Sequence, residues 1–263
     1  MLTQPLTFPS STASDATAWR PGRPSFTRLT AVELRKMVNT TSGRWLLVTF
    51  LALPLVVLAF SLRGAVTGIS ITDNAWDTPL TVLRQFLPVL GILAMTSEWT
   101  QRTTLTTFAL VPQRGRVLAA KLVAALVLTV AVVVTVAALC AGFSVLTGLL
   151  TSTPVHADHA LQRLGGEVIT AALQTLLGAA LGAVIQQTAV TMVIYFLVPT
   201  LVEVGASTAF GRGSRWVSVL EGFDNIATMH LTGVFAPTLV VVVLWVLLPL
   251  GIGTVRTLTR HVD

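Results

Sequence analysis

The feature that most constrains this chain is an apolar run from Val168 to Val202 that contains no charged residue. A helix crosses the hydrocarbon core of a bilayer with about 20 apolar residues, so this run is too long for one span. Its clearest polar interruption is Gln186-Gln187-Thr188, which predicts a tight turn between two membrane helices. The whole chain is 53% hydrophobic and only 11% charged, whereas soluble domains carry about 25% charged residues. We therefore expect a membrane protein with several spans.

The other long apolar runs complete a set of six predicted spans. Pro54 and Pro88 fall inside the first two of them, where proline disturbs a helix. Between the last two spans, the segment 205–231 mixes apolar and charged residues, which predicts short helices lying at the outer leaflet. The predicted fold is an all-α membrane protein with spans at about 45–62, 78–97, 117–146, 168–185, 189–204 and 234–254.

The distribution of basic residues predicts the orientation of these spans. Twelve of the 17 Lys and Arg residues lie in segments expected on the side of the termini, and five lie in segments on the other side. Cytoplasmic segments are enriched in Lys and Arg, so both termini are predicted to be cytoplasmic. We therefore expect the basic residues behind the net charge of +6 to set the topology and to contact anionic headgroups, rather than to bind nucleic acid. Residues 1–28, rich in Ser, Thr and Pro, are predicted to be a disordered cytoplasmic tail preceding a membrane domain at 29–263.

A short amphipathic helix is predicted before the first span. Thr30-Ala-Val-Glu33 has the pattern of a capping box, which marks a helix start. The residues that follow separate into an apolar stripe and a charged stripe, as in a helix lying on the inner leaflet. A soluble helix docked on a partner would show the same pattern. The apolar stripe consists of Leu34, Met37 and Val38, and the opposite, charged stripe of Glu33, Arg35 and Lys36.

A polar and basic interruption from Ser97 to Lys121 separates the second and third spans. Its charges exclude it from the hydrocarbon core. Apolar residues from Leu105 to Val111 recur at roughly helical spacing, and the pattern ends at Pro112. This predicts a short helix along the cytoplasmic face, with an apolar stripe available to contact another protein. An ordinary basic loop is the alternative interpretation.

Several further patterns have two interpretations each. Gly178 and Gly182 in the fourth span have the spacing that lets membrane helices approach closely, either within the bundle or in a dimer. His156 to His159 could bind a metal, but a solvated loop explains the same residues. Arg84 and Glu203 lie near the predicted outer interface, where snorkelling reduces the cost of a charge. An ion-coupled carrier would instead keep a carboxylate near mid-membrane.

The chain contains no Walker A sequence, because neither of its two lysines, Lys36 and Lys121, follows a glycine. It also lacks the His-Glu-x-x-His and Gly-x-Ser-x-Gly patterns of metalloproteases and serine hydrolases. We therefore expect no enzyme activity and no cofactor in this chain. Any ATP-driven process must draw its energy from a partner.

The order of these features resembles the membrane subunit of an ABC-2 type transporter. That family has an interfacial elbow helix with a Glu-x-x-Lys-like start, here Glu33-Leu-Arg-Lys36, and six spans. It also has a coupling helix between the second and third spans, with a pattern of Glu, Gly-Thr, an apolar helix, Pro, Arg and Lys. Arg102 stands where the family has glycine. The matching residues here are Glu98, Arg102, Thr103, Leu105, Phe108, Val111, Pro112 and Arg114, followed by Arg116 and Lys121.

The resemblance implies a permease in the cytoplasmic membrane of a bacterium. Two six-span subunits, identical or paralogous, would face each other, and each would rest its coupling helix on one of two cytosolic ATPase subunits that bind ATP and Mg²⁺. The family exports drugs, antibiotics, lipids or polysaccharides, and the apolar spans favour a hydrophobic or amphipathic cargo. The alternatives are an ion-coupled secondary carrier and an accessory membrane protein or membrane-embedded enzyme without an ATPase.

Overall fold

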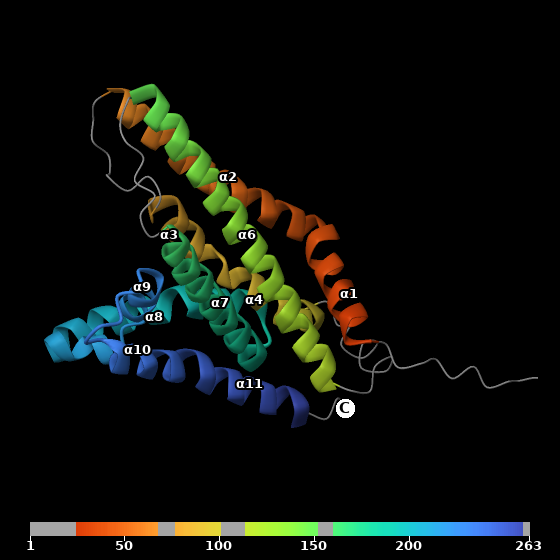
Figure 1. Cartoon of the computed structure of the whole chain (residues 1–263). Helices are drawn as coiled ribbons and strands as arrows, with labels where there is room; N and C mark the ends of the chain where they lie inside the picture. Colours follow the sequence, from red (N-terminus) through yellow and green to blue (C-terminus); the bar gives the residue numbers. More distant parts are fainter. Residues whose placement is uncertain (1–24, 68–76, 101–113, 152–159, 260–263) are drawn as a thin grey trace, which may run out of the picture.

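The computed structural model describes residues 25–67, 77–100, 114–151 and 160–259 (Figure 1). Within these ranges the chain is all-helical, and six helical stretches are long and apolar enough to cross a membrane. This confirms the predicted class and the predicted number of spans. The spans are formed by α2 (Thr41–Thr67), α3 (Asp77–Phe86) with α4 (Pro88–Thr100), α6 (Arg114–Thr151), α7 (Ala160–Ile185), α8 (Thr188–Phe210), and α10 (Phe235–Val242) with α11 (Leu248–Thr259).

Some span boundaries differ from the prediction, because charged residues are accommodated inside helices. The fourth span was predicted from residue 168, but α7 begins at Ala160 and includes Arg163 and Glu167. The fifth was predicted to end at 204, but α8 continues to Phe210 past Glu203. The tight turn after Ile185 is confirmed: Gln186 has φ 61 and its N–H donates to the Gly182 carbonyl (2.8 Å).

The second span is divided into two helices at Leu87. α4 begins with Pro88, which suits the first turn of a helix because that position requires no N–H donor. Pro54, in contrast, lies inside the continuous helix α2. Near the other end of the chain, a π-helical turn at Val243–Leu247 joins α10 to α11. The second and sixth spans are therefore both built from two helical pieces.

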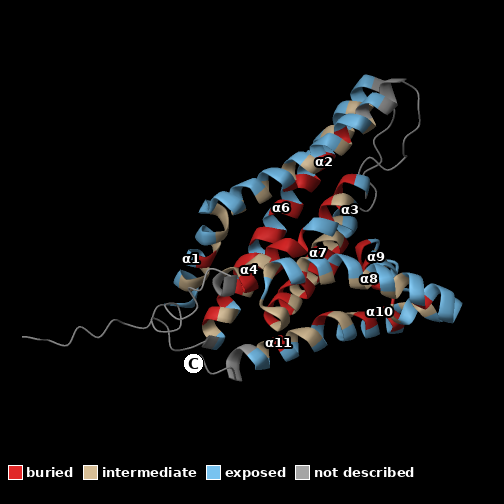
Figure 2. Ribbon diagram, turned by 180° about the vertical axis from the view of Figure 1, so that it is seen from behind, coloured by how far each residue is buried: buried red, intermediate tan, exposed pale blue. Residues whose placement is uncertain are grey.

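The second and fourth spans form the centre of the bundle and are the most buried of the six. Figure 2 shows buried residues concentrated on α4, α6 and α7. Gly178 lies against the Pro88 carbonyl and Gly91 against the Thr175 carbonyl, so a side chain at either glycine would collide with backbone. Gly182 faces Met95, whose Cβ would lie 3.1 Å from an added Cβ. These glycine contacts of α7 are made within the chain.

Two shorter helices lie beside the spans. α1 (Phe26–Asn39) precedes α2 and packs against α6. α9 (Val219–Ala227) follows a 3-10 helix at Gly211–Trp216 and packs against α7, α8 and α10. The prediction of short helices before the sixth span is thus confirmed, although residues 205–210 belong to α8. Because successive spans alternate in direction, α1 and α9 lie on opposite sides of the bundle (Figure 1).

Candidate functional site

The predicted coupling segment falls mostly outside the described residues. Arg102, Thr103, Leu105, Phe108, Val111 and Pro112 lie in the undescribed range 101–113, as do the potential metal ligands His156 to His159 in 152–159. The structure places the backbone of Glu98 in the last turn of α4 and that of Arg114 at the first residue of α6. The segment therefore lies between α4 and α6 in the chain.

The amphipathic helix before the first span is present as α1, but it begins earlier than predicted. Ser25 caps its N-terminus by accepting a hydrogen bond from the Arg28 N–H (3.3 Å). The capping-box interpretation of Thr30 is wrong, because Thr30 lies inside the helix and donates to the Phe26 carbonyl (3.1 Å). The predicted disordered tail, 1–28, is also too long at its C-terminal end, since residues 26–28 belong to α1. Ser25 provides an equivalent cap more than one turn upstream.

The sequence pattern placed Glu33 on the charged stripe of α1, opposite the apolar stripe, but the structure buries it. It is only 9% exposed and accepts hydrogen bonds from the ammonium of Lys121 on α6 (3.1 Å) and from that of Lys36 (2.9 Å). Lys121 is buried as well, whereas Lys36 and Arg35 are exposed. We call Glu33, Lys36 and Lys121 the α1 cluster. It joins the amphipathic helix to the third span.

The α1 cluster holds its carboxylate in the charged form. Burial raises the pKa of Glu33, but the nearby Lys121 and Lys36 ammonium groups together lower it by more, so the pKa lies below its ordinary value of 4.5. A buried carboxylate between two lysines is stabilised when it is ionised. The attachment of α1 to α6 is therefore an ionic contact at neutral pH.

A second buried charge lies on the other side of the bundle. Arg84 of α3 was predicted to snorkel toward headgroups, but it is buried and contacts two carboxylates instead. Its Nη1 lies 3.4 Å from Glu167 Oε1 on α7, and its Nη2 lies 3.4 Å from Asp224 Oδ1 on α9. Glu167 is largely buried and Asp224 is largely exposed. We call Arg84, Glu167 and Asp224 the α9 cluster.

Polar contacts also fix α9 on the bundle. Ser218 caps the helix by accepting from the Glu221 N–H (3.1 Å), and its hydroxyl donates to Glu203 Oε2 on α8 (2.6 Å). Trp245 donates its indole N–H to the Val217 carbonyl (3.1 Å). Thr170 of α7 donates to the Phe223 carbonyl (3.3 Å). Glu203, considered from the sequence as a charge near lipid, thus positions the start of α9.

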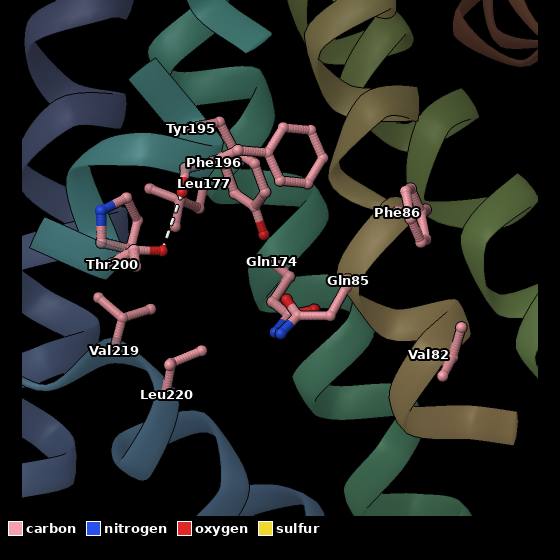
Figure 3. Close-up of a pocket in the computed structure, with 11 residues that line it drawn as sticks. Val82, Gln85, Phe86, Gln174, Leu177, Tyr195, Phe196, Thr200, Val219 and Leu220 are labelled. Carbon is pink, nitrogen blue, oxygen red and sulfur yellow. Dashed lines mark hydrogen bonds between the residues drawn. The ribbon is translucent and has the colours of Figure 1, made fainter. Parts of the chain in front are cut away.

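A cavity of about 390 Å³ opens between α3, α7, α8 and α9 (Figure 3). Its lining is mainly aromatic and aliphatic, with Gln85, Gln174, Tyr195 and Thr200 as the polar members. Ligand pockets in proteins commonly have this composition and a volume of about 300–1,000 Å³. No sequence pattern indicated this site, because its residues come from four helices and form no local motif.

Comparison with known proteins returns no match to a protein-family model, to a curated protein or to a solved structure. Across the residues that the structure describes, no group of three His, Cys, Asp or Glu side chains could hold a metal ion. Function must therefore be argued from the two charged clusters, the cavity and the order of helices.

Proposed function

We propose that this chain is the membrane-spanning subunit of an ATP-driven exporter of the ABC-2 type, moving a hydrophobic or amphipathic molecule. The observation that carries the proposal is the α1 cluster. It ties an amphipathic helix to the first turns of α6, the helix that follows the predicted coupling segment 101–113. An amphipathic helix, six spans and a polar segment between the second and third spans follow one another in the order expected for such a subunit, which supports the proposal.

The geometry suits transmission of movement from a cytosolic partner. Lys121 is seven residues into α6, about 10 Å from its start at 1.5 Å per residue. A displacement of segment 101–113 would act on α4 and α6, between which it runs, and through Glu33 on α1. Because α4 packs closely on α7, the displacement would also reach the centre of the bundle.

The proposed assembly contains two permease subunits and two ATPase subunits. α2, α8 and the α10–α11 span are the least buried spans, so they carry most of the surface available to lipid or to a second subunit. The absence of a Walker A sequence assigns ATP and Mg²⁺ to the partner chains. We place segment 101–113 and both termini on the cytoplasmic side, where such partners are found.

The proposal is tested by purifying the tagged protein from its native membranes and measuring bound ATPase by mass spectrometry and nucleotide hydrolysis. Wild type should retain a P-loop ATPase. Phe108→Asp should insert normally, lose that ATPase and lose ATP-driven transport, because a charge would replace the apolar contact of the coupling segment. Phe26→Asp is the matched control, since Phe26 is an exposed aromatic at the start of α1 and outside the coupling segment.

Two results would contradict the proposal. One is a wild-type preparation that transports its substrate with no nucleotide-hydrolysing companion, as an ion-coupled carrier would. The other is labelling of Trp99 and Gln113 by a membrane-impermeant reagent added outside intact cells, because the coupling segment would then face away from any cytosolic ATPase.

A further inference from the structure

We propose that the cavity between α3, α7, α8 and α9 binds one uncharged amphipathic molecule, with its polar group on Gln174 and its apolar part against Phe86 and Phe196. As a cargo site the cavity depends on the export function proposed above. Binding itself does not, and it can be measured on this chain without an ATPase.

The cavity has a buried floor and an exposed aromatic mouth. Leu177, Tyr195 and Val219 are almost fully buried, whereas Phe86 and Phe196 are 40% and 43% exposed. The rings of these two phenylalanines lie 6.2 Å apart and are tilted by 53°. A long apolar molecule could therefore contact aromatic faces at the mouth and reach the floor from there.

Gln174 places a hydrogen-bond acceptor without a partner in this mainly apolar site. The residue is 4% exposed, and its Oε1 has no hydrogen-bond partner among the described parts of the chain. A buried polar atom without a partner destabilises the folded protein, so native proteins rarely contain one without a reason. Figure 3 shows Gln174 beside the space that it lines with Gln85 and Tyr195. A hydroxyl or amide group of a ligand would supply the missing partner.

The lining of the cavity carries no charged side chain, which favours an uncharged ligand. None of the lining residues is Asp, Glu, Lys, Arg or His. Arg84, adjacent to Gln85 in the sequence, is directed to Glu167 and Asp224. A charged head group in the cavity would thus lose its hydration without gaining a counterion, which is strongly unfavourable. A neutral head group with a hydrogen-bond donor meets no such penalty.

The test is photolabelling of the purified full-length protein with three diazirine probes of equal chain length: a long-chain alcohol, the corresponding fatty acid and the corresponding alkane. Labelled residues are located by mass spectrometry. The alcohol should label the α3 and α8 peptides that contain Phe86 and Phe196, and it should do so more than either other probe. Gln174→Leu should reduce alcohol labelling there about two- to tenfold, as for the loss of one hydrogen bond, and should leave alkane labelling unchanged.

Two further variants separate occupancy of the cavity from general contact with lipid. Val82→Trp fills the cavity from α3 and should reduce labelling by the alcohol. Val193→Trp places the same side chain on an exposed part of α8 outside the cavity and should have no effect. Without ligand, Gln174→Leu should melt at the same or a higher temperature than wild type, because it removes an unsatisfied polar group.

The source of the natural ligand is identified by repeating the labelling in detergent and in phospholipid nanodiscs. Equal labelling in both supports an uncharged ligand other than bulk phospholipid. Labelling in detergent alone would show that phospholipid, which carries a charged head group, occupies the cavity, and would overturn the assignment of an uncharged ligand. Equal labelling by the three probes, no effect of Gln174→Leu on alcohol labelling, or a lower melting temperature of that variant would each overturn the proposal. None of these results bears on ATPase association, so the two proposals fail separately.

Discussion

The α1 cluster and the α9 cluster both bury a charge beside apolar helices, but they are built differently. In the α1 cluster, one carboxylate on α1 forms ion pairs with two lysines, one of which is exposed. The pair with Lys121 joins a single peripheral helix to α6. In the α9 cluster, one guanidinium bridges α3, α7 and α9. Arg presents a planar and rigid fork of donors, whereas each Lys is a point charge on a flexible chain. We therefore expect the attachment of α1 to be more flexible than that of α9.

This difference fits the proposed function. A helix that follows a moving ATPase needs an attachment that tolerates some displacement, and the lysines of the α1 cluster provide one. The cavity that we assign to a ligand needs a fixed framework, and the α9 cluster joins three of the four elements around it. Variants that remove the charges of each cluster in turn test this difference.

The largest effect is expected from Arg84→Met, which keeps an unbranched apolar stem and removes the guanidinium charge. Glu167 would stay largely buried without the guanidinium, and breaking such a buried pair costs about 3–5 kcal/mol. The expected result is a large fall in the melting temperature of the purified protein, monitored by tryptophan fluorescence in detergent.

Asp224→Asn is the matched control, because it changes the other carboxylate on the same guanidinium. Asp224 is 63% exposed at its side chain, so this variant should lose less than about 1 kcal/mol. Arg84→Met combined with Glu167→Gln should recover part of the loss. If Arg84→Met were no less stable than Asp224→Asn, the assignment of Arg84 as the rigid bridge would be wrong.

A smaller effect is expected from Lys121→Met in the α1 cluster. The variant removes one charged hydrogen bond, worth about 1.5–3 kcal/mol, while Lys36 continues to neutralise Glu33. Its main expected result is local: a cysteine placed in α1 should react faster with a thiol reagent in detergent than in wild type, after Cys140 is replaced by alanine.

Lys36→Met tests the exposed partner of the same carboxylate and should change α1 reactivity much less, by the equivalent of less than about 1 kcal/mol. In the proposed function, segment 101–113 acts through its ATPase partner, so Phe108→Asp is expected to leave this reactivity unchanged in the isolated chain. Equal reactivity of the Lys121→Met and wild-type proteins would show that α1 is held by its apolar contacts alone.

The spans were predictable from the sequence because a membrane imposes a simple local rule. An apolar run of sufficient length is a span whatever its neighbours do, and the turn at Gln186 followed from the limit on that length. The helical extension of α7 from Ala160 to 167 was missed for the converse reason. Glu167 is accommodated there next to Arg84, which lies 83 positions away, and a local rule does not include that partner.

The candidate site was less predictable because its parts are distant in the sequence. The helical pattern around Glu33 placed it on the charged stripe of α1. That pattern contains no information on Lys121, which lies 88 positions later in the chain. The cavity combines residues from Val82 to Leu220 with no motif. The coupling residues Glu98 to Arg114 remain a prediction from the resemblance, because their side chains lie outside the described residues.

The smallest expected effect is a pH dependence confined to the α1 side. The pKa of Glu33 in the folded protein is lowered, so its ionised form stabilises the attachment of α1 at pH values above the ordinary pKa of 4.5. That stabilisation is lost as the pH falls through the lowered pKa. Because the reactive thiolate fraction falls with pH in both proteins, wild type is compared with Glu33→Gln at the same pH. From pH 6 to pH 4 and below, the ratio of wild-type to Glu33→Gln reactivity in α1 should rise, because Glu33→Gln cannot titrate at this position. Parallel curves for the two proteins would show that the carboxylate does not control the attachment of α1.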